Sequence, residues 1–130
     1  MTTTPMTTPI PSAINLHKRS KELELTYSDG QSFKLPCELL RVLSPSAEVL
    51  GHGNPVLQTG KKHVVITGIE AVGNYALKLT FDDGHNSGLF SWDYLHDLCV
   101  NQENHWEDYL RQIHAAGASR DPEASVVKLM

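Results

Sequence analysis

The chain has few cysteines, with only two in 130 residues. Cys37 and Cys99 form neither a disulfide framework nor a Cys-x-x-Cys metal motif. The start of the chain lacks the basic segment and apolar core of a signal peptide, and no apolar run is long enough to span a membrane. Together these absences predict a cytoplasmic protein with reduced thiols.

Positive charge is also scarce. The chain has 11 Lys and Arg against 15 Asp and Glu, which gives a formal net charge of -4. Local basic spots occur only around residues 18–21 and 61–62, which argues against nucleic acid as a partner. Neither the Gly-Lys-Ser/Thr loop that binds phosphate nor the Gly-x-Gly-x-x-Gly dinucleotide fingerprint is present. The sequence therefore predicts no nucleotide cofactor.

Hydrophobic residues make up 40% and charged residues 20% of the chain, which is typical of a folded domain. Residues 1–12 are rich in Thr and Pro and predict a disordered lead-in. Residues 13–117 are expected to form one domain ending in a helix, and residues 118–130 a flexible tail.

Periodicity predicts hairpins first and helices last. Strands are expected at 13–17, 22–27, 32–35, 63–70, 75–81 and 88–90, and helices at 36–43, from 92 onward and at 103–116. A long irregular loop is expected at 49–62. This order predicts an α+β fold: a single domain with a twisted antiparallel sheet of hairpins, on which a short helix and the C-terminal helices pack.

The most informative stretch is the turn Asp82-Asp83-Gly84, directly followed by His85. Asp-Gly is a strong hairpin signal, so the turn holds the histidine in a defined position. His85 could be a metal ligand, a catalytic base or a structural hydrogen-bonding group. Asp82 and Asp83 are explained by the preference of turns for Asp.

Other candidates have weaker support. His105-Trp106-Glu107 has the spacing of part of a non-haem iron site, but on a helix residues two apart point to opposite sides. Cys37 opens a helix, where its pKa could be lowered, yet it has no assigned histidine partner. Cys99 is expected to be part of a helix core.

Several motifs occur in a shared order along residues 13–100. They are Leu35-Pro36-x-x-Leu39-Leu40-Arg41, Ser44-Pro45-Ser46-Ala47-Glu48-Val49, Ile66-Thr67-Gly68-Ile69-Glu70, Gly73-Asn74-Tyr75, Phe81-Asp82-Asp83-Gly84-His85-x-Ser87-Gly88 and Trp92-x-Tyr94-Leu95. In these motifs the chain resembles the gamma-butyrobetaine hydroxylase-like N-terminal domain.

In dioxygenases of that type, the resemblance implies a structural zinc held by three cysteines and the histidine of an Asp-Gly-His turn. The histidine corresponds to His85. The cysteine positions fall on Ser44, Ser46 and Val49, so all three thiolates are absent. We therefore expect no family zinc and no other bound metal in this chain. Instead, Ser44 and Ser46 are expected to hydrogen-bond to His85.

The resemblance also bears on function. We expect 130 residues to leave no space for the jelly-roll catalytic domain that uses iron and 2-oxoglutarate. The same domain accompanies P-loop carrier ATPases of iron–sulfur cluster assembly. The resulting hypothesis is a non-catalytic accessory domain that binds a protein of the iron–sulfur or cofactor maturation machinery. Its contact surface is expected at the 49–62 loop and at His52, Asp83, His85 and Trp92.

Two alternatives stay open. One is a metal-binding protein or metal-dependent enzyme that uses His85, His52 and Cys37. The other is an accessory subunit that completes an iron and 2-oxoglutarate dioxygenase in trans.

Overall fold

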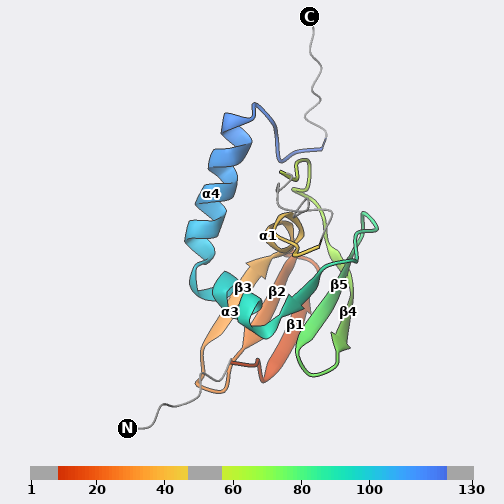
Figure 1. Ribbon diagram of the computed structural model, residues 1–130, viewed down its shortest axis with the longest axis vertical. Helices are drawn as coiled ribbons and strands as arrows, with labels where there is room; N and C mark the ends of the chain where they lie inside the picture. The colour runs from red at the N-terminus through yellow and green to blue at the C-terminus, as the bar shows by residue number, and fades with distance from the viewer. Residues whose placement is uncertain (1–8, 47–56, 123–130) are drawn as a thin grey trace, which may run out of the picture.

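The computed structural model describes residues 9–46 and 57–122 and has the expected α+β architecture (Figure 1). Six strands form two antiparallel three-stranded sheets, with the orders β1-β2-β3 and β4-β5-β6. Three helices complete the described part of the fold. The elements are β1 (Ala13–His17), β2 (Glu22–Thr26), β3 (Ser32–Pro36), α1 (Cys37–Val42), β4 (Ile66–Val72), β5 (Ala76–Phe81), β6 (Leu89–Ser91), α3 (Trp92–Val100) and α4 (Gln102–Ala115).

The first sheet is built from two hairpins whose alternation places the apolar residues on one face. In β2, Leu23 and Leu25 are fully buried, and Leu23 lies opposite the buried Leu35 of β3. The turn before β3 closes at Gly30, whose φ is 91° and whose N–H donates to the Tyr27 carbonyl at 2.9 Å. Glycine suits this left-handed conformation because it has no Cβ. The expected hairpin turn is therefore present.

The second sheet presents Leu77, Leu79 and Phe81 of β5 to the same core, together with Phe90 of β6. Strand β4 begins at Ile66, three residues later than the sequence predicts. The preceding residues form a turn, in which the Val64 N–H donates to the Lys61 carbonyl at 3.1 Å. The chain therefore becomes regular only after this turn.

The strands form two sheets, whereas the prediction from the sequence describes one. Local alternation predicts each group of hairpin strands. Which strand edges pair across a long connection depends instead on tertiary packing. Helix α1 and the segment after it separate the two groups in the chain. Both sheets nevertheless contribute to a single core cluster.

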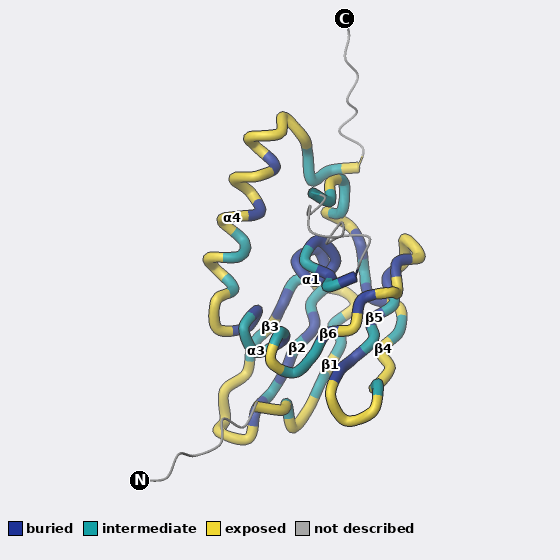
Figure 2. Tube along the Cα trace, in the orientation of Figure 1, coloured by how far each residue is buried: buried dark blue, intermediate teal, exposed yellow. Residues whose placement is uncertain are grey.

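Helix α1 is short, and all six of its residues are buried, which Figure 2 shows as the dark coil at the centre. Pro36 precedes its first residue, which fits the fixed φ of proline at a helix start. Helix α3 begins where Ser91 Oγ accepts a hydrogen bond from the Tyr94 N–H at 3.2 Å, as the sequence predicts. Helix α4 buries only Tyr109 and Ile113, so most of its surface is exposed.

The segment after α4 returns across the domain instead of leaving it (Figure 1). The Gly60 N–H donates to the Ser119 carbonyl and the Lys62 N–H to the Arg120 carbonyl, both at 2.9 Å. The sequence predicts a flexible tail from Ala118, but as far as Pro122 this segment has specific contacts. The signal was missed because its partners lie about 60 positions earlier in the chain, where local patterns carry no information.

Arg120 anchors this return. Its Nε and one Nη each donate to the Glu38 carboxylate at 2.8 Å, and its guanidinium lies 5.0 Å from the centre of the Trp106 ring. Glu38 is only 5% exposed, and the Tyr109 hydroxyl donates at 2.6 Å to its Oε2, the oxygen that also accepts from Arg120 Nε. Burial, followed by this bond to Glu38, raises the pKa of Tyr109 well above its usual value. A buried carboxylate is thereby balanced by a bidentate arginine.

We expect Arg120→Ala to lower the free energy of unfolding by about 2 kcal/mol, because the buried Glu38 carboxylate loses its counter-charge. Urea denaturation followed by circular dichroism measures the change. Arg111→Ala is the matched control, because Arg111 and Asp108 form an ion pair whose side chains are 69% and 57% exposed. Its cost should stay below about 0.5 kcal/mol. Equal losses in the two variants would contradict this account.

Candidate functional site

The site begins at the turn between β5 and β6. The Gly84 N–H donates to the Phe81 carbonyl, and the Phe81 N–H donates to the His85 carbonyl, both at 2.9 Å. Gly84 has a φ of 90°, which an L residue with a Cβ rarely adopts. The predicted Asp-Gly turn is therefore present, and it holds Asp83 and His85 on a rigid end of the sheet.

Asp83 is the centre of an ion-pair network. Its Oδ2 accepts from Arg41 Nε at 2.8 Å and from Lys61 Nζ at 2.7 Å, and its Oδ1 accepts from the His85 N–H at 3.1 Å. Arg41 is itself buried and also donates to Gln58 Oε1 at 3.2 Å. One carboxylate therefore joins the end of α1, the segment after residue 57 and the hairpin.

The network changes the titration of Asp83. Burial alone raises the pKa of this carboxyl, but hydrogen bonds from Lys61, the His85 N–H and Arg41 outweigh it and lower the pKa to about 2. Asp83 is therefore charged at neutral pH and is balanced by two cations. A carboxylate held in this way is a poor general base, because its proton affinity is low.

The imidazole of His85 lies on the inner side of the turn. Its Nε2 is 2.8 Å from Ser44 Oγ, and which of the two donates depends on the ring tautomer. His85 is 7% exposed and Ser44 is fully buried. The hydrogen bond expected between His85 and Ser44 is thus present, and it connects the hairpin to the chain just after α1.

Gly88 closes this pair from the other side. A Cβ built at Gly88 would lie 2.1 Å from Ser44 Oγ and 3.2 Å from Pro45 Cδ, so only glycine allows this close approach. The Tyr94 hydroxyl donates to the Leu43 carbonyl at 2.5 Å and holds the same segment from α3. The Ser44 hydroxyl and His85 imidazole resemble the start of a Ser–His catalytic pair, but Ser44 has no exposed surface on which a substrate could react.

The positions that correspond to the family's zinc ligands do not fit that metal. Ser44 and Ser46 are buried and have hydroxyl groups where thiolates would be needed, and Val49 lies outside the described residues. Within residues 9–46 and 57–122, no group of three or more His, Cys, Asp or Glu side chains could hold a metal ion. The site retains His85 and uses it in a hydrogen bond to protein.

The remaining candidates are dispersed. The Trp92 Nε1–H donates to the Asn74 carbonyl at 2.9 Å. This contact lies at the opposite end of β5 from Asp83, and a strand of this length spans roughly 17 Å. Cys37 is fully buried, and burial raises the pKa of its thiol. Burial also raises the pKa of Cys99, to about 11. His52 lies outside the described residues.

Sequence reasoning found Asp83, His85 and Ser44 but missed the groups that pair with them. Arg41 and Lys61 lie 42 and 22 positions before Asp83, and nothing in their local sequence distinguishes them from surface cations. Gly88 ends the turn motif of the sequence analysis, but its role was not predicted, although an isolated glycine in a strand pattern indicates a close approach of another segment.

The fold and the site together define a small α+β domain whose Asp-Gly-His turn is tied into the protein by ion pairs and hydrogen bonds. The model of the gamma-butyrobetaine hydroxylase-like N-terminal family matches residues 14–96, and the chain belongs to this family. No curated protein matches the chain.

Solved structures include similar proteins. Two were determined by solution NMR. The first is 60% identical over 95% of this chain and 99% of its own, with a TM-score of 0.82. The second is 53% identical over 99% of both chains, with a TM-score of 0.78. A protein of unknown function from Acidithiobacillus ferrooxidans, crystallised as a member of the DUF971 family, is 38% identical over 74% of this chain and 97% of its own, with a TM-score of 0.58.

We expect the stability conferred by Asp83 to depend on pH. Because the pKa falls from 3.8 to about 2 on folding, this stabilisation is complete above pH 4 and is lost as the pH falls toward 2. Asp83→Asn should therefore be most destabilised at neutral pH, and its deficit should shrink through that window. Urea midpoints from pH 7 to pH 2 measure this. Asp108→Asn, at a largely exposed carboxylate, is the control; the same pH-dependent deficit in both variants would contradict the prediction.

A second prediction concerns the His85–Ser44 hydrogen bond. Ser44→Ala should cost about 1–3 kcal/mol of unfolding free energy, because a buried ring nitrogen loses its partner. A double-mutant cycle with His85→Ala should give a coupling energy of at least about 0.5 kcal/mol. His63→Ala replaces an exposed histidine and should be nearly neutral. A coupling energy of zero would show that the contact adds nothing to stability.

Proposed function

We propose that this chain is a non-catalytic accessory domain that binds a partner protein in the maturation of iron–sulfur clusters or another cofactor. The observation that carries the proposal is that the polar groups of the Asp-Gly-His turn are all engaged by other protein groups. Its serine–histidine pair is closed under Gly88, and its aspartate is neutralised by Arg41 and Lys61. In this proposal, groups that could catalyse a reaction serve instead to hold the hairpin against the rest of the domain.

The surface that we propose for contact lies beside the hairpin. A shallow hollow of about 260 Å³ is bordered by Lys61, His63, Asp82, Asp83 and Pro122. It brings together the hairpin, the segment after residue 57 and the returning segment after α4. Rigid loops on a stable scaffold are the usual location of binding residues. Its mixture of both charge signs suits a polar protein interface.

The link to cofactor maturation rests on the resemblance, in which this domain accompanies P-loop carrier ATPases of iron–sulfur assembly. A cytoplasmic location is part of the same proposal. Both cysteines are free and buried, which is compatible with a reducing compartment. Among the residues that the structure describes, no helix is long and apolar enough to cross a membrane.

Affinity capture with quantitative mass spectrometry, using an extract of the source organism, tests the proposal. The wild-type chain should enrich iron–sulfur or cofactor assembly proteins. The double variant Lys62→Glu, His63→Ser alters exposed side chains beside the hollow and should reduce that enrichment at least about tenfold, which corresponds to about 1.4 kcal/mol. Lys18→Glu makes the same charge change in the exposed turn after β1 and should bind like wild type.

Elemental analysis of protein purified without affinity metals is the complementary measurement. Stoichiometric zinc or iron that disappears in His85→Ala would replace this proposal with a metal-dependent role. Equal capture by the Lys62→Glu, His63→Ser double variant and by wild type would reject the proposed surface. Enrichment of unrelated proteins alone would reject the link to cofactor maturation.

A further inference from the structure

The segment that returns across the domain after α4, residues 118–122, lies against the part of the chain that carries Lys61. The N–H groups of Gly60 and Lys62 donate to two successive carbonyls of this returning segment, both at 2.9 Å. The Lys61 carbonyl accepts from the Val64 N–H at 3.1 Å, which shapes the local turn but does not attach it to the rest of the domain. Both chain neighbours of Lys61 are therefore fixed by the returning segment.

The side chain of Lys61 reaches the hairpin from this position. Its Nζ donates to Asp83 Oδ2 at 2.7 Å. Burial raises the pKa of Asp83, and the bond from Lys61 is the largest of the interactions that lower it. Holding a lysine side chain in one conformation costs entropy, and a mobile backbone raises that cost. The bond to Asp83 therefore weakens when the backbone around Lys61 is released.

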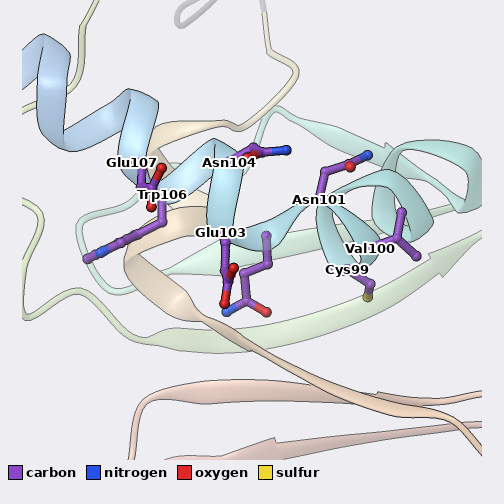
Figure 3. Close-up of a pocket in the computed structure, with 8 residues that line it drawn as sticks. Cys99, Val100, Asn101, Glu103, Asn104, Trp106 and Glu107 are labelled. Carbon is purple, nitrogen blue, oxygen red and sulfur yellow. The ribbon is translucent and has the colours of Figure 1, made fainter.

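Arg120 holds the returning segment in place. Its guanidinium makes two hydrogen bonds of 2.8 Å to the carboxylate of Glu38, which is only 5% exposed. The same guanidinium lies 5.0 Å from the centre of the Trp106 ring, which projects from α4 in Figure 3. A bidentate pair between arginine and carboxylate fixes orientation as well as distance. The contacts of Arg120 therefore fix the backbone that bonds to Gly60 and Lys62.

Other contacts also hold this part of the chain, but they lie farther from Lys61. Gln58 Oε1 accepts from Arg41 at 3.2 Å, three residues before Lys61. The Val65 N–H donates to Asp82 Oδ1 at 3.2 Å, four residues after Lys61. Each of these bonds keeps the chain near the hairpin. Neither fixes the backbone immediately beside the lysine.

We infer that Arg120 positions Lys61 on Asp83 and thereby sets the charge and shape of the hollow beside the hairpin. The connection runs from Arg120 through the returning segment to the backbone on both sides of Lys61. Pro122, at the end of that segment, also borders the hollow. The consequence for partner binding rests on the proposed function, whereas the internal connection does not.

Release of Arg120 changes the hollow in two ways. Asp83 keeps its bond of 2.8 Å from Arg41, while the Lys61 amine turns toward water. The border that Pro122 forms is displaced with the returning segment. A partner that recognises the charges of the hollow then meets a different surface. Because coupling between two sites is reciprocal, a partner that draws Lys61 away from Asp83 also loosens the returning segment.

Competitive labelling of lysine amines tests the internal connection. The folded full chain is treated with a trace of acetic anhydride at mildly alkaline pH, and tandem mass spectrometry measures acetylation at Lys61 and at Lys18. Lys18 is exposed in the turn after β1 and is the internal reference. In Arg120→Ala the ratio of Lys61 to Lys18 labelling should rise at least about twofold, the scale expected for a partly exposed ion pair.

Four further variants calibrate the ratio, and circular dichroism verifies that each is folded. Asp83→Asn removes the acceptor and gives the ratio of a released amine. Arg120→Lys keeps the charge without the bidentate pair and should give an intermediate ratio, and it carries the test if Arg120→Ala does not fold. Tyr109→Phe removes the other donor to the same carboxylate and should leave the ratio unchanged. Arg111→Ala removes an exposed arginine of α4 and should also leave it unchanged.

Affinity capture with wild type and Arg120→Ala tests the consequence for a partner. Capture of the proteins enriched by wild type should fall at least about twofold in the variant. If wild type enriches no assembly proteins, the proposed function fails, and the labelling ratio still decides the internal connection.

Two labelling results would overturn the inference. One is a ratio in Arg120→Ala equal to that of wild type. The other is an equal rise in Tyr109→Phe, which would assign the effect to lost stability instead of positioning. A raised ratio with unchanged capture would support the internal connection and reject its consequence for the partner.

Discussion

The carboxylate of Asp83 is the constraint on which the functional end of the molecule depends. Through Arg41 and Lys61 it holds the end of α1 and the segment after residue 57 against the hairpin, and through the His85 N–H it shapes its own turn. These three segments lie far apart in the sequence, so no local pattern connects them. Because both cations meet one oxygen in a partly buried place, the network is stronger than an exposed ion pair would be. The hydrogen bond between His85 and Ser44 then completes the connection on the inner side.

Two other polar interactions connect α1 to further parts of the fold in the same way. Glu38 is buried, and Arg120 and Tyr109 both donate to it. This one carboxylate therefore connects the central helix to α4 and to the segment that follows α4. The two charged side chains of helix α1, Glu38 and Arg41, are therefore both bonded to other segments of the fold. This arrangement explains how a six-residue helix, too short to be stable alone, occupies the centre of the domain.

Much of the fold could be predicted from local patterns. The alternation in β2 and β5, the Asp-Gly turn, the proline before α1 and the Ser91 cap each predict an element that the structure contains. The site could be predicted only in part. His85 followed from the Asp-Gly turn signal and Ser44 from the family resemblance, whereas Arg41, Lys61, Gly88 and Arg120 act through contacts between distant segments. No local pattern distinguishes a lysine that pairs with Asp83 from one that faces water.

The sequence by itself determined which segments form strands and helices and where the turn that presents His85 lies, because each depends on neighbours in the chain. It also determined that positions 44, 46 and 49 carry no thiolate. Tertiary structure decided the division into two sheets, the anchoring of residues 119 and 120, and the closing of the Ser44–His85 pair under Gly88. These features arise when segments tens of residues apart become packed, and their energies depend on burial and distance. A linear sequence specifies neither quantity directly.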